Sequence, residues 1–254
     1  ASGVNSSMWD LADQMKKQNA RLGYVNYIAD NNGFTLKDMF TYGQKRNQIN
    51  GEDYADGPTW NFSMNCGVEG ETTSRNVQKI RDRRMKNAAA MLFLAQGAPM
   101  LMAGDEDCNT QQGNNNAYCQ DNEIGWKDWK QSRPAKEFLK YIKKLIAFRK
   151  EHEVLRMEQP MQLLDTKSYG YPDLSYHEES AWISSGFFSR EALGILYCGK
   201  YANEAEDVYL GFNFSDFHRN LALPKQNRKR KWYLLMDTGM KNAFLTEPEE
   251  LLEP

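Results

Sequence analysis

The chain has 254 residues, 41% of them hydrophobic and 12% aromatic, so it can bury the core of one large or two ordinary domains and is not an intrinsically disordered segment. Its formal net charge of −2 provides no general attraction to nucleic acid or to an anionic membrane. The basic run at residues 228–231 is typical of a solvated turn, so we expect neither nucleic acid nor a membrane among the partners.

In chain order, the first 150 residues alternate between helical and strand patterns. Residues 5–20 predict a helix, 24–29 a strand, 43–73 a long polar loop, 74–96 a helix that Ser74 caps, 99–103 a buried strand, 104–131 a second polar loop and 134–152 a helix. Strands that alternate with helices indicate parallel βα units. Two strands cannot close a barrel, so we expect these units to form part of a larger structure.

The apolar stretch at residues 88–104 approaches the length of a membrane span, but Gln96-Gly97-Ala98-Pro99 interrupts it. We therefore expect a helix that ends there and a strand that follows. No signal peptide is visible at the start of the sequence, which favours a cytoplasmic protein, although an upstream signal stays open because the sequence begins with alanine.

Beyond residue 155 the pattern changes to short strands separated by turns. Period-two alternation marks residues 208–214, and further strands are expected at 193–197, 220–223 and 232–236. This pattern predicts a small antiparallel β-sandwich. We accordingly divide the chain into a segment of parallel units at 1–155 and a sandwich at 156–254.

Neither cysteines nor histidines form a recognisable metal or catalytic motif. No cysteine pair has CxxC spacing, which indicates reduced thiols in a cytosolic protein, and no histidine belongs to a zinc or triad motif. The residues concerned are Cys66, Cys108, Cys119 and Cys198, and His152, His177 and His218. We expect no cofactor and no metal site.

A series of specific motifs, in a fixed order, spans nearly the whole chain. They include Val-Asn-Tyr at 25–27, Gly-Phe-Thr-Leu at 33–36, Asn-Cys-Gly-Val-Glu-Gly at 65–70, Gln-Gly-Ala-Pro-Met-Leu at 96–101 and the asparagine-rich stretch at 112–121. With these motifs the chain resembles the C-terminal part of the glycogen-debranching enzymes, isoamylases and pullulanases of the α-amylase superfamily. Coincidence does not explain several such motifs in the right order.

This resemblance implies an α/β fold plus an all-β fold: strands seven and eight of a (β/α)8 barrel with their helices, followed by an antiparallel β-sandwich. It also implies an active site at the carboxyl ends of the barrel strands and retaining hydrolysis of branched α-glucans such as glycogen or maltodextrin. Such hydrolysis needs a nucleophilic carboxylate and a carboxylic acid about 5 Å apart. Both come from earlier strands in the family, so we assign no catalytic residue here and expect the chain alone to be inactive.

Asn31 and Asn32 occupy the positions where the resemblance implies a histidine and a carboxylate that supports the transition state. An amide keeps the shape of a carboxylate but carries no charge, and losing one such interaction costs about 3–4 kcal/mol in a water-poor site. Four explanations fit: a non-catalytic homologue that still binds α-glucan, a weakly active enzyme with a rearranged loop, substitutions engineered to trap substrate, or a shifted register. We favour the first, and a purely structural homologue is the remaining alternative.

The expected sugar contacts gather on the loops that follow the two strands. We predict substrate-binding roles for Asn31, Asn32, Phe34, Asn115, Asn116 and Tyr118. Amides and an aromatic ring suit sugar hydroxyls and the apolar sugar face, although asparagine-rich loops also form turns and Phe34 could simply pack beneath its loop. Trp126 and Trp129 could form a stacking platform, but we favour partly buried anchors for both.

Two further expectations concern acidic residues and sheet edges. The cluster of residues 105–107 (Asp-Glu-Asp) could be catalytic or metal-binding, but we favour a supporting role, since these side chains cannot share one face of a strand. Two isolated barrel strands leave open edges. We therefore expect self-association, pairing with the missing N-terminal part of the barrel, or coverage by the segments at 5–20 and 43–73.

Overall fold

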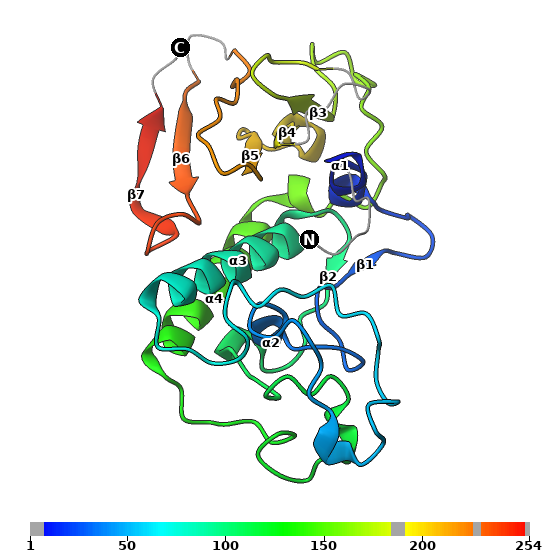
Figure 1. The fold of residues 1–254 in the computed structure, drawn as a ribbon. Helices are drawn as coiled ribbons and strands as arrows, with labels where there is room; N and C mark the ends of the chain where they lie inside the picture. Colours follow the sequence, from blue (N-terminus) through cyan, green and yellow to red (C-terminus); the bar gives the residue numbers. More distant parts are fainter. Residues whose placement is uncertain (1–7, 184–190, 226–229, 252–254) are drawn as a thin grey trace.

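The computed structural model describes residues 8–183, 191–225 and 230–251 (Figure 1). Its helices are α1 (Met8–Lys16), α2 (Leu36–Met39), α3 (Arg75–Leu94) and α4 (Arg133–Glu151). Its strands are β1 (Val25–Asn26), β2 (Ala98–Pro99), β3 (Leu174–His177), β4 (Ala192–Tyr197), β5 (Val208–Asn213), β6 (Trp232–Met236) and β7 (Phe244–Leu251). All the predicted helices form, with ends that move by a few residues.

Strands β1 and β2 form the expected parallel pair, in which Val25 lies opposite Ala98. The predicted strands at 24–29 and 99–103 were too long. Pro99 has no N–H to donate, and the chain turns soon after β1, where the Asp30 carboxylate accepts the Asn32 N–H at 2.8 Å. Gly97 adopts φ +81°, and a Cβ there would lie 2.6 Å from the Tyr24 carbonyl oxygen, so the pairing depends on glycine.

Helices α3 and α4 lie side by side in the middle of the molecule (Figure 1). In α4, Ser132 accepts the Ala135 N–H at 3.3 Å and Pro134 occupies the first turn, as expected. The predicted apolar stripe of α4 is buried along Phe138, Tyr141, Ile142 and Leu145. Ser74 precedes α3 as predicted, but its side chain makes no capping hydrogen bond.

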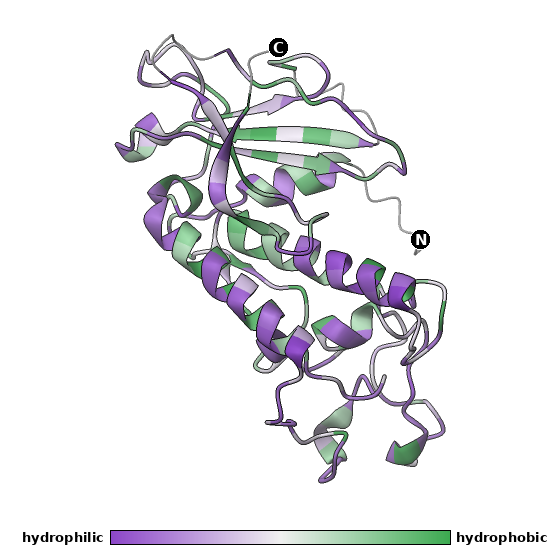
Figure 2. Ribbon diagram, turned by 90° about the vertical axis from the view of Figure 1, so that its left-hand side faces the viewer, coloured by the Kyte–Doolittle hydropathy of each residue, from purple (hydrophilic) through white to green (hydrophobic). Residues whose placement is uncertain are grey.

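Beyond α4 the chain forms two small antiparallel sheets, one of order β3-β4-β5 and one of β6 with β7. The inner strand β4 is hydrophobic along most of its length (Figure 2), and all six of its residues are buried. The strand predicted at 220–223 does not form. That stretch makes one backbone hydrogen bond to another segment, from the Ala222 N–H to Glu178 O. It ends at Pro224, which has no N–H to donate to a neighbouring strand.

The basic run predicted as a solvated turn is described only in part. Arg228 and Lys229 lie outside the described residues. Arg230 pairs with Asp207 at 2.9 Å, and Lys231 pairs with Glu250 at 2.7 Å. Both described charges are therefore satisfied within the protein.

One hydrophobic cluster unites α1, α3 and α4 with the three-stranded sheet. Helix α1 sits at the junction, where the Ala12 carbonyl accepts the Tyr176 hydroxyl at 3.3 Å and the Met15 carbonyl accepts the Tyr197 hydroxyl at 3.0 Å. The Gln96 N–H also donates to Met15 O, at 2.9 Å. The division at residue 155 stays a prediction, because this core crosses it.

None of the helices in the described part of the chain is long and apolar enough to cross a membrane. Likewise, the described histidine, cysteine, aspartate and glutamate residues contain no group of three or more placed to hold a metal ion. The four cysteines are not joined in disulfides.

Candidate functional site

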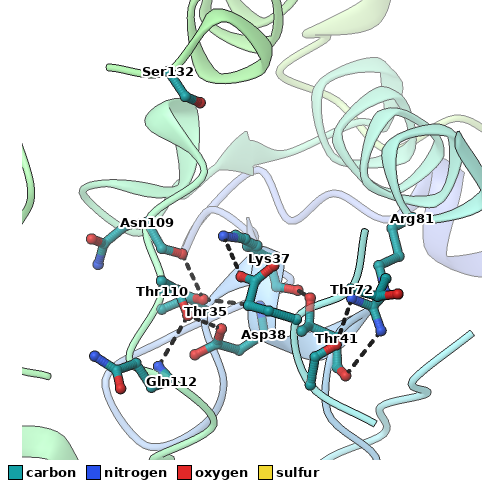
Figure 3. A network of polar contacts seen from close by, with 12 residues as sticks. Thr35, Lys37, Asp38, Thr41, Thr72, Arg81, Asn109, Thr110, Gln112 and Ser132 are labelled. Carbon is teal, nitrogen blue, oxygen red and sulfur yellow. Dashed lines mark hydrogen bonds and ion pairs between the residues drawn. The ribbon is translucent and has the colours of Figure 1, made fainter. Parts of the chain in front are cut away.

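The loops that follow β1 and β2 are fastened together beneath their surface by α2 (Figure 3). Thr35 caps α2, since its hydroxyl accepts the Asp38 N–H, and donates to the Asn109 carbonyl at 2.9 Å. The buried Asp38 carboxylate accepts the Thr110 hydroxyl and the backbone N–H groups of Gln111 and Gly113, at 2.8 and 3.2 Å. The two loops therefore hold a fixed relative position.

A second buried carboxylate supports the start of the same helix. Asp105 is 2% exposed and accepts the Leu36 N–H at 2.9 Å. Burial raises its pKa to about 7, because a charged carboxylate loses its hydration there and receives only this backbone bond in return. Burial likewise raises the pKa of Asp38.

The other two acidic residues of the 105–107 cluster have partners different from that of Asp105. Glu106 accepts the Gly104 N–H at 2.8 Å, Asp107 accepts a hydrogen bond from Gln131, and both carboxylates pair with Lys127. All three carboxylates make local contacts within the protein, and their supporting role stays a prediction.

A network of side-chain amides joins the loop at 43–61 to the loop at 113–120. Asn115 is fully buried: its Nδ2 donates to Pro58 O at 2.8 Å and to Asn61 Oδ1 at 2.6 Å, and its Oδ1 accepts Asn47 Nδ2 at 2.8 Å. Asn116 Nδ2 donates to Asp56 Oδ2 at 3.1 Å. A Cβ on Gly57 would lie 2.3 Å from Asn115 Oδ1, so only glycine fits against this network.

Asp56 is the charged member of this network. Asn47, Asn50 and Asn116 all donate to its Oδ2, at 3.0, 2.6 and 3.1 Å. The hydrogen bond from Asn50, followed by those from Asn116 and Asn47, lowers the pKa of Asp56. The carboxylate therefore stays ionised as an acceptor at the meeting point of the two loops.

The structure brings some of the predicted site residues together and leaves others apart. Asn115 and Asn116 share the amide network, whereas no hydrogen bond among the described residues connects Asn31 or Asn32 to it. Phe34 is 2% exposed and packs beneath its loop, so its sugar contact stays a prediction, whereas Tyr118 is 88% exposed. The sugar-binding roles of all six residues stay predictions.

Two tryptophans differ from expectation. Trp126 is 59% exposed and Trp129 is 80% exposed, so the interpretation of both as partly buried anchors was wrong. Trp126 Nε1 donates to Asp121 at 2.9 Å, and the Lys127 ammonium lies 4.9 Å from the Trp129 ring centroid. These local contacts hold the rings at the surface without burying them.

Sequence reasoning missed a cleft of about 610 Å³ within the loop at 43–69. Its lining includes Tyr54, Trp60 and Phe62, which are 41%, 53% and 64% exposed. The signal in the sequence was the Trp-Asn-Phe triplet at 60–62, two aromatic residues two positions apart inside a polar loop. The sequence predicted a long polar loop at 43–73 but no cleft within it.

A serine and a histidine also approach each other in the C-terminal sheet, with Ser175 Oγ 2.9 Å from His177 Nε2. His177 Nδ1 accepts the Trp182 N–H at 3.1 Å, so the neutral ring carries its proton on Nε2 and donates it to the serine. Burial lowers the pKa of His177 to about 4. In the neutral imidazole, the nitrogen that faces the serine therefore carries the hydrogen and cannot accept the serine proton as a general base would. The pair instead stabilises the sheet.

Comparison with known proteins places this arrangement in a family, although no family model matches the chain. Rice isoamylase 3 (chloroplastic) is 33% identical over 89% of the chain and 27% of its own length. The glycogen operon protein GlgX homolog of Mycobacterium tuberculosis is 43% identical over 52% of the chain and 18% of its own length. The chain belongs to the isoamylase, GlgX and pullulanase group of the α-amylase superfamily. It spans about a quarter or less of these members of the group.

Solved structures of the group agree with the fold. The pullulanase from Bacillus acidopullulyticus matches 90% of the chain and 22% of its own length with a TM-score of 0.57 at 16% identity. The type I pullulanase of Bacillus subtilis, solved with maltose, matches 72% of the chain and 22% of its own length with a TM-score of 0.51 at 23% identity. The mixed α/β arrangement with small antiparallel sheets thus corresponds to part of a pullulanase.

Proposed function

We propose that this chain supplies the α-glucan-recognising C-terminal part of a debranching glycoside hydrolase and does not cut a glycosidic bond by itself. The observation that carries the proposal is the 33% identity to an isoamylase over 89% of the chain. In the proposed assembly, the parallel pair β1 and β2 represents strands seven and eight of a (β/α)8 barrel. The loops beyond these strands then lie at the end of the barrel where active sites are built.

The proposed inactivity rests on the residues that follow β1. Retaining hydrolysis needs two carboxylates about 5 Å apart, and the resemblance assigns both to strands that the chain does not contain. Asn31 and Asn32 replace the supporting histidine and carboxylate, and both are exposed in the turn after β1. A neutral amide cannot offset the positive charge that develops on the sugar ring. A non-catalytic α-glucan-binding homologue is the second candidate, and the Asn31-Asn32 pair favours it.

Calorimetric titration with a branched maltodextrin tests the proposal. We expect saturable binding that weakens about five- to tenfold in Tyr118→Ala, since a sugar–aromatic contact is comparable to an aromatic pair. Phe217→Ala, at another exposed aromatic residue, is the matched control and should bind like the wild type. A reducing-sugar assay on the same samples should detect no cleavage.

Two results would contradict the proposal. Absence of binding at millimolar sugar, with the chain folded, would leave it a structural segment of a larger glycosidase. Release of reducing sugar by the purified chain would show that it contains a complete catalytic site.

A further inference from the structure

We infer that the cleft within the loop at 43–69, here called the Trp60 cleft, binds a linear α-1,4-glucan chain at a site separate from Tyr118. The Trp60 cleft is lined by residues 43–46, Gln48, Tyr54, residues 59–63 and Glu69 and has a volume of about 610 Å³. That volume lies within the range of small-molecule sites and suits a few sugar rings. The choice of an α-glucan over other sugars rests on the proposed function.

The aromatic side chains of the cleft are available for stacking. Trp60 and Phe62 are 53% and 64% exposed, and their rings stand edge to face, with centroids 6.2 Å apart and planes at 77°. The C–H face of a glucose ring stacks on an aromatic face through the same apolar contact that makes exposed aromatic rings binding residues. Two nearly perpendicular faces fit a chain whose successive rings turn, as those of an α-1,4-glucan do, better than a flat, extended β-linked chain.

Backbone conformation supplies an independent observation. Tyr54 has φ 62° and Phe62 has φ 51°, a left-handed conformation that is uncommon for bulky residues. A loop that only connected two elements would be less strained with glycine or asparagine at these positions. Strained residues cluster at ligand sites because the surrounding structure must aim their side chains. Here the strained positions carry two of the three aromatic rings of the cleft.

Both walls of the Trp60 cleft are held in place before any ligand arrives. On one wall, the Arg46 N–H donates to Gly113 O at 2.7 Å, and the Gly43 N–H donates to Glu69 Oε2 at 2.8 Å. On the other wall, the buried Asn115 amide donates to Asn61 Oδ1, the residue between Trp60 and Phe62 in the sequence, and the Met64 N–H donates to Met39 O at 2.9 Å. A site that is rigid before binding loses little conformational entropy when the ligand binds.

The polar lining of the cleft retains hydrogen-bonding capacity for sugar hydroxyls. In the described structure, no intramolecular hydrogen bond involves the side chains of Gln44, Gln48, Thr59 or Ser63, all of which line the cleft. Each of these four side chains can both donate and accept, as a hydroxyl-rich ligand requires. Lys45, by contrast, donates to Asp56 O at 2.6 Å, so it supports the wall.

Titration of the full chain with maltoheptaose tests the inference, with cellohexaose as the β-linked comparison. We expect Trp60→Ala to weaken maltoheptaose binding about five- to tenfold. Phe217→Ala, which removes an exposed aromatic residue outside the cleft lining, should leave that binding unchanged. Cellohexaose should bind more weakly than maltoheptaose to the wild-type chain.

A second variant separates binding from folding. Phe62→Gly removes a stacking ring and relieves the left-handed strain, so it should keep or raise the melting temperature while weakening maltoheptaose binding. A merely structural Phe62 would give a lower melting temperature with unchanged binding, which would count against the inference.

The remaining outcomes distinguish the two proposals. Maltoheptaose binding that survives Trp60→Ala and Phe62→Gly but weakens in Tyr118→Ala would overturn the Trp60 cleft and leave the proposed function standing. A wild-type chain that is folded and binds no α-glucan would overturn both.

Discussion

At the scale of single residues, the most distinctive group is the Asp105 carboxylate, which is buried at the start of α2 with one backbone donor. The pKa of Asp105, about 7, lies above that of an unfolded chain, so the folded protein binds an extra proton between about pH 4 and pH 7. This extra proton makes the folded state lose stability as pH rises through that interval. The contribution of Asp105 stops changing only about one pH unit above its pKa, when the carboxyl is fully ionised in the folded state as well.

Asp105→Asn should therefore flatten the pH dependence of stability. The amide oxygen still accepts the Leu36 N–H, and no charge develops as pH rises. Relative to the wild type, the variant should gain up to about 4 kcal/mol in free energy of unfolding between pH 4 and pH 7. Urea unfolding at several pH values measures this difference. His177 changes stability in the opposite direction but is common to both proteins, so it cancels.

Asn115 permits a second prediction at this scale, because its side chain joins three loop positions. Asn115→Ala leaves Pro58 O and Asn61 Oδ1 without their donors and should cost about 2–3 kcal/mol. Amide exchange should accelerate mainly at residues 43–61. Tyr118→Ala, at an 88% exposed position, should change stability by less than about 0.5 kcal/mol. Equal effects of the two substitutions would contradict a structural role for the amide network.

The sequence identified these asparagines but not what they do. Asn115 and Asn116 were expected to contact a sugar, because residue type and loop position indicate chemistry but not the direction in which a side chain points. In the structure, the Asn115 amide donates to Pro58 and Asn61 in the opposite loop. These acceptors lie 54–57 residues earlier in the chain, so no local sequence pattern reveals them. The exposed aromatic residues Trp60 and Phe62 were missed for the same reason: exposure and ring orientation depend on how distant segments close around the loop.

At the scale of elements, the end of α3 depends on one side chain of α4. The buried Arg149 guanidinium donates to Phe93 O at 2.8 Å and to Ala95 O at 2.6 Å, and also to Gly97 O. These carbonyls belong to the last turn of α3 and to the connection between α3 and β2, so they lack regular partners. Burial lowers the pKa of Arg149, but these three acceptors match its planar fork.

Arg149→Lys should consequently be far from conservative. A lysine keeps the charge but cannot reach three carbonyls in one plane, and we expect a loss of about 2–4 kcal/mol in free energy of unfolding. Thermal denaturation measures the loss. Lys143→Ala, at an exposed position of the same helix, is the control and should shift stability by less than about 0.5 kcal/mol. A wild-type melting temperature in Arg149→Lys would show that water satisfies these carbonyls instead.

Helices were predictable at this scale because their signals are local: the apolar stripe and Pro134 of α4 appear within one window of sequence. Strands were less so. The lengths of β1 and β2 depend on a partner far along the chain. The apolar residues at 221–223 resemble a short strand, but no strand of the described structure pairs with them. A strand pattern in the sequence indicates that one face of a segment is buried, but it does not identify the strand with which that segment pairs.

For the whole molecule, the two-stranded parallel sheet of β1 and β2 is surrounded by exposed apolar residues. Leu22, Val25 and Tyr27 are 87%, 56% and 56% exposed, and Met100 is 41% exposed. Helix α1 covers this region only in part, through hydrogen bonds from Gln14 to Asn26 and Tyr24. A surface of this kind favours association with another chain or with further barrel strands.

The isolated chain should therefore self-associate in a concentration-dependent way. Sedimentation velocity should show a larger species that dissociates when Val25 and Tyr27 are both replaced by lysine. Phe217→Lys adds charge at another exposed aromatic residue and should leave the association unchanged. A clean monomer with fast amide exchange at residues 24–29 would contradict both self-association and coverage of the edge.

Helix α1 has a further consequence for how this protein could be divided or recombined. Met15 is 1% exposed because the elements around it come from both sides of residue 155, and its carbonyl serves Gln96 and Tyr197 together. Separating the three-stranded sheet from the first 155 residues would therefore break this junction at Met15. A graft of residues 156–254 onto another protein would carry an uncovered apolar face and a tyrosine hydroxyl without its acceptor, unless the first helix travelled with it.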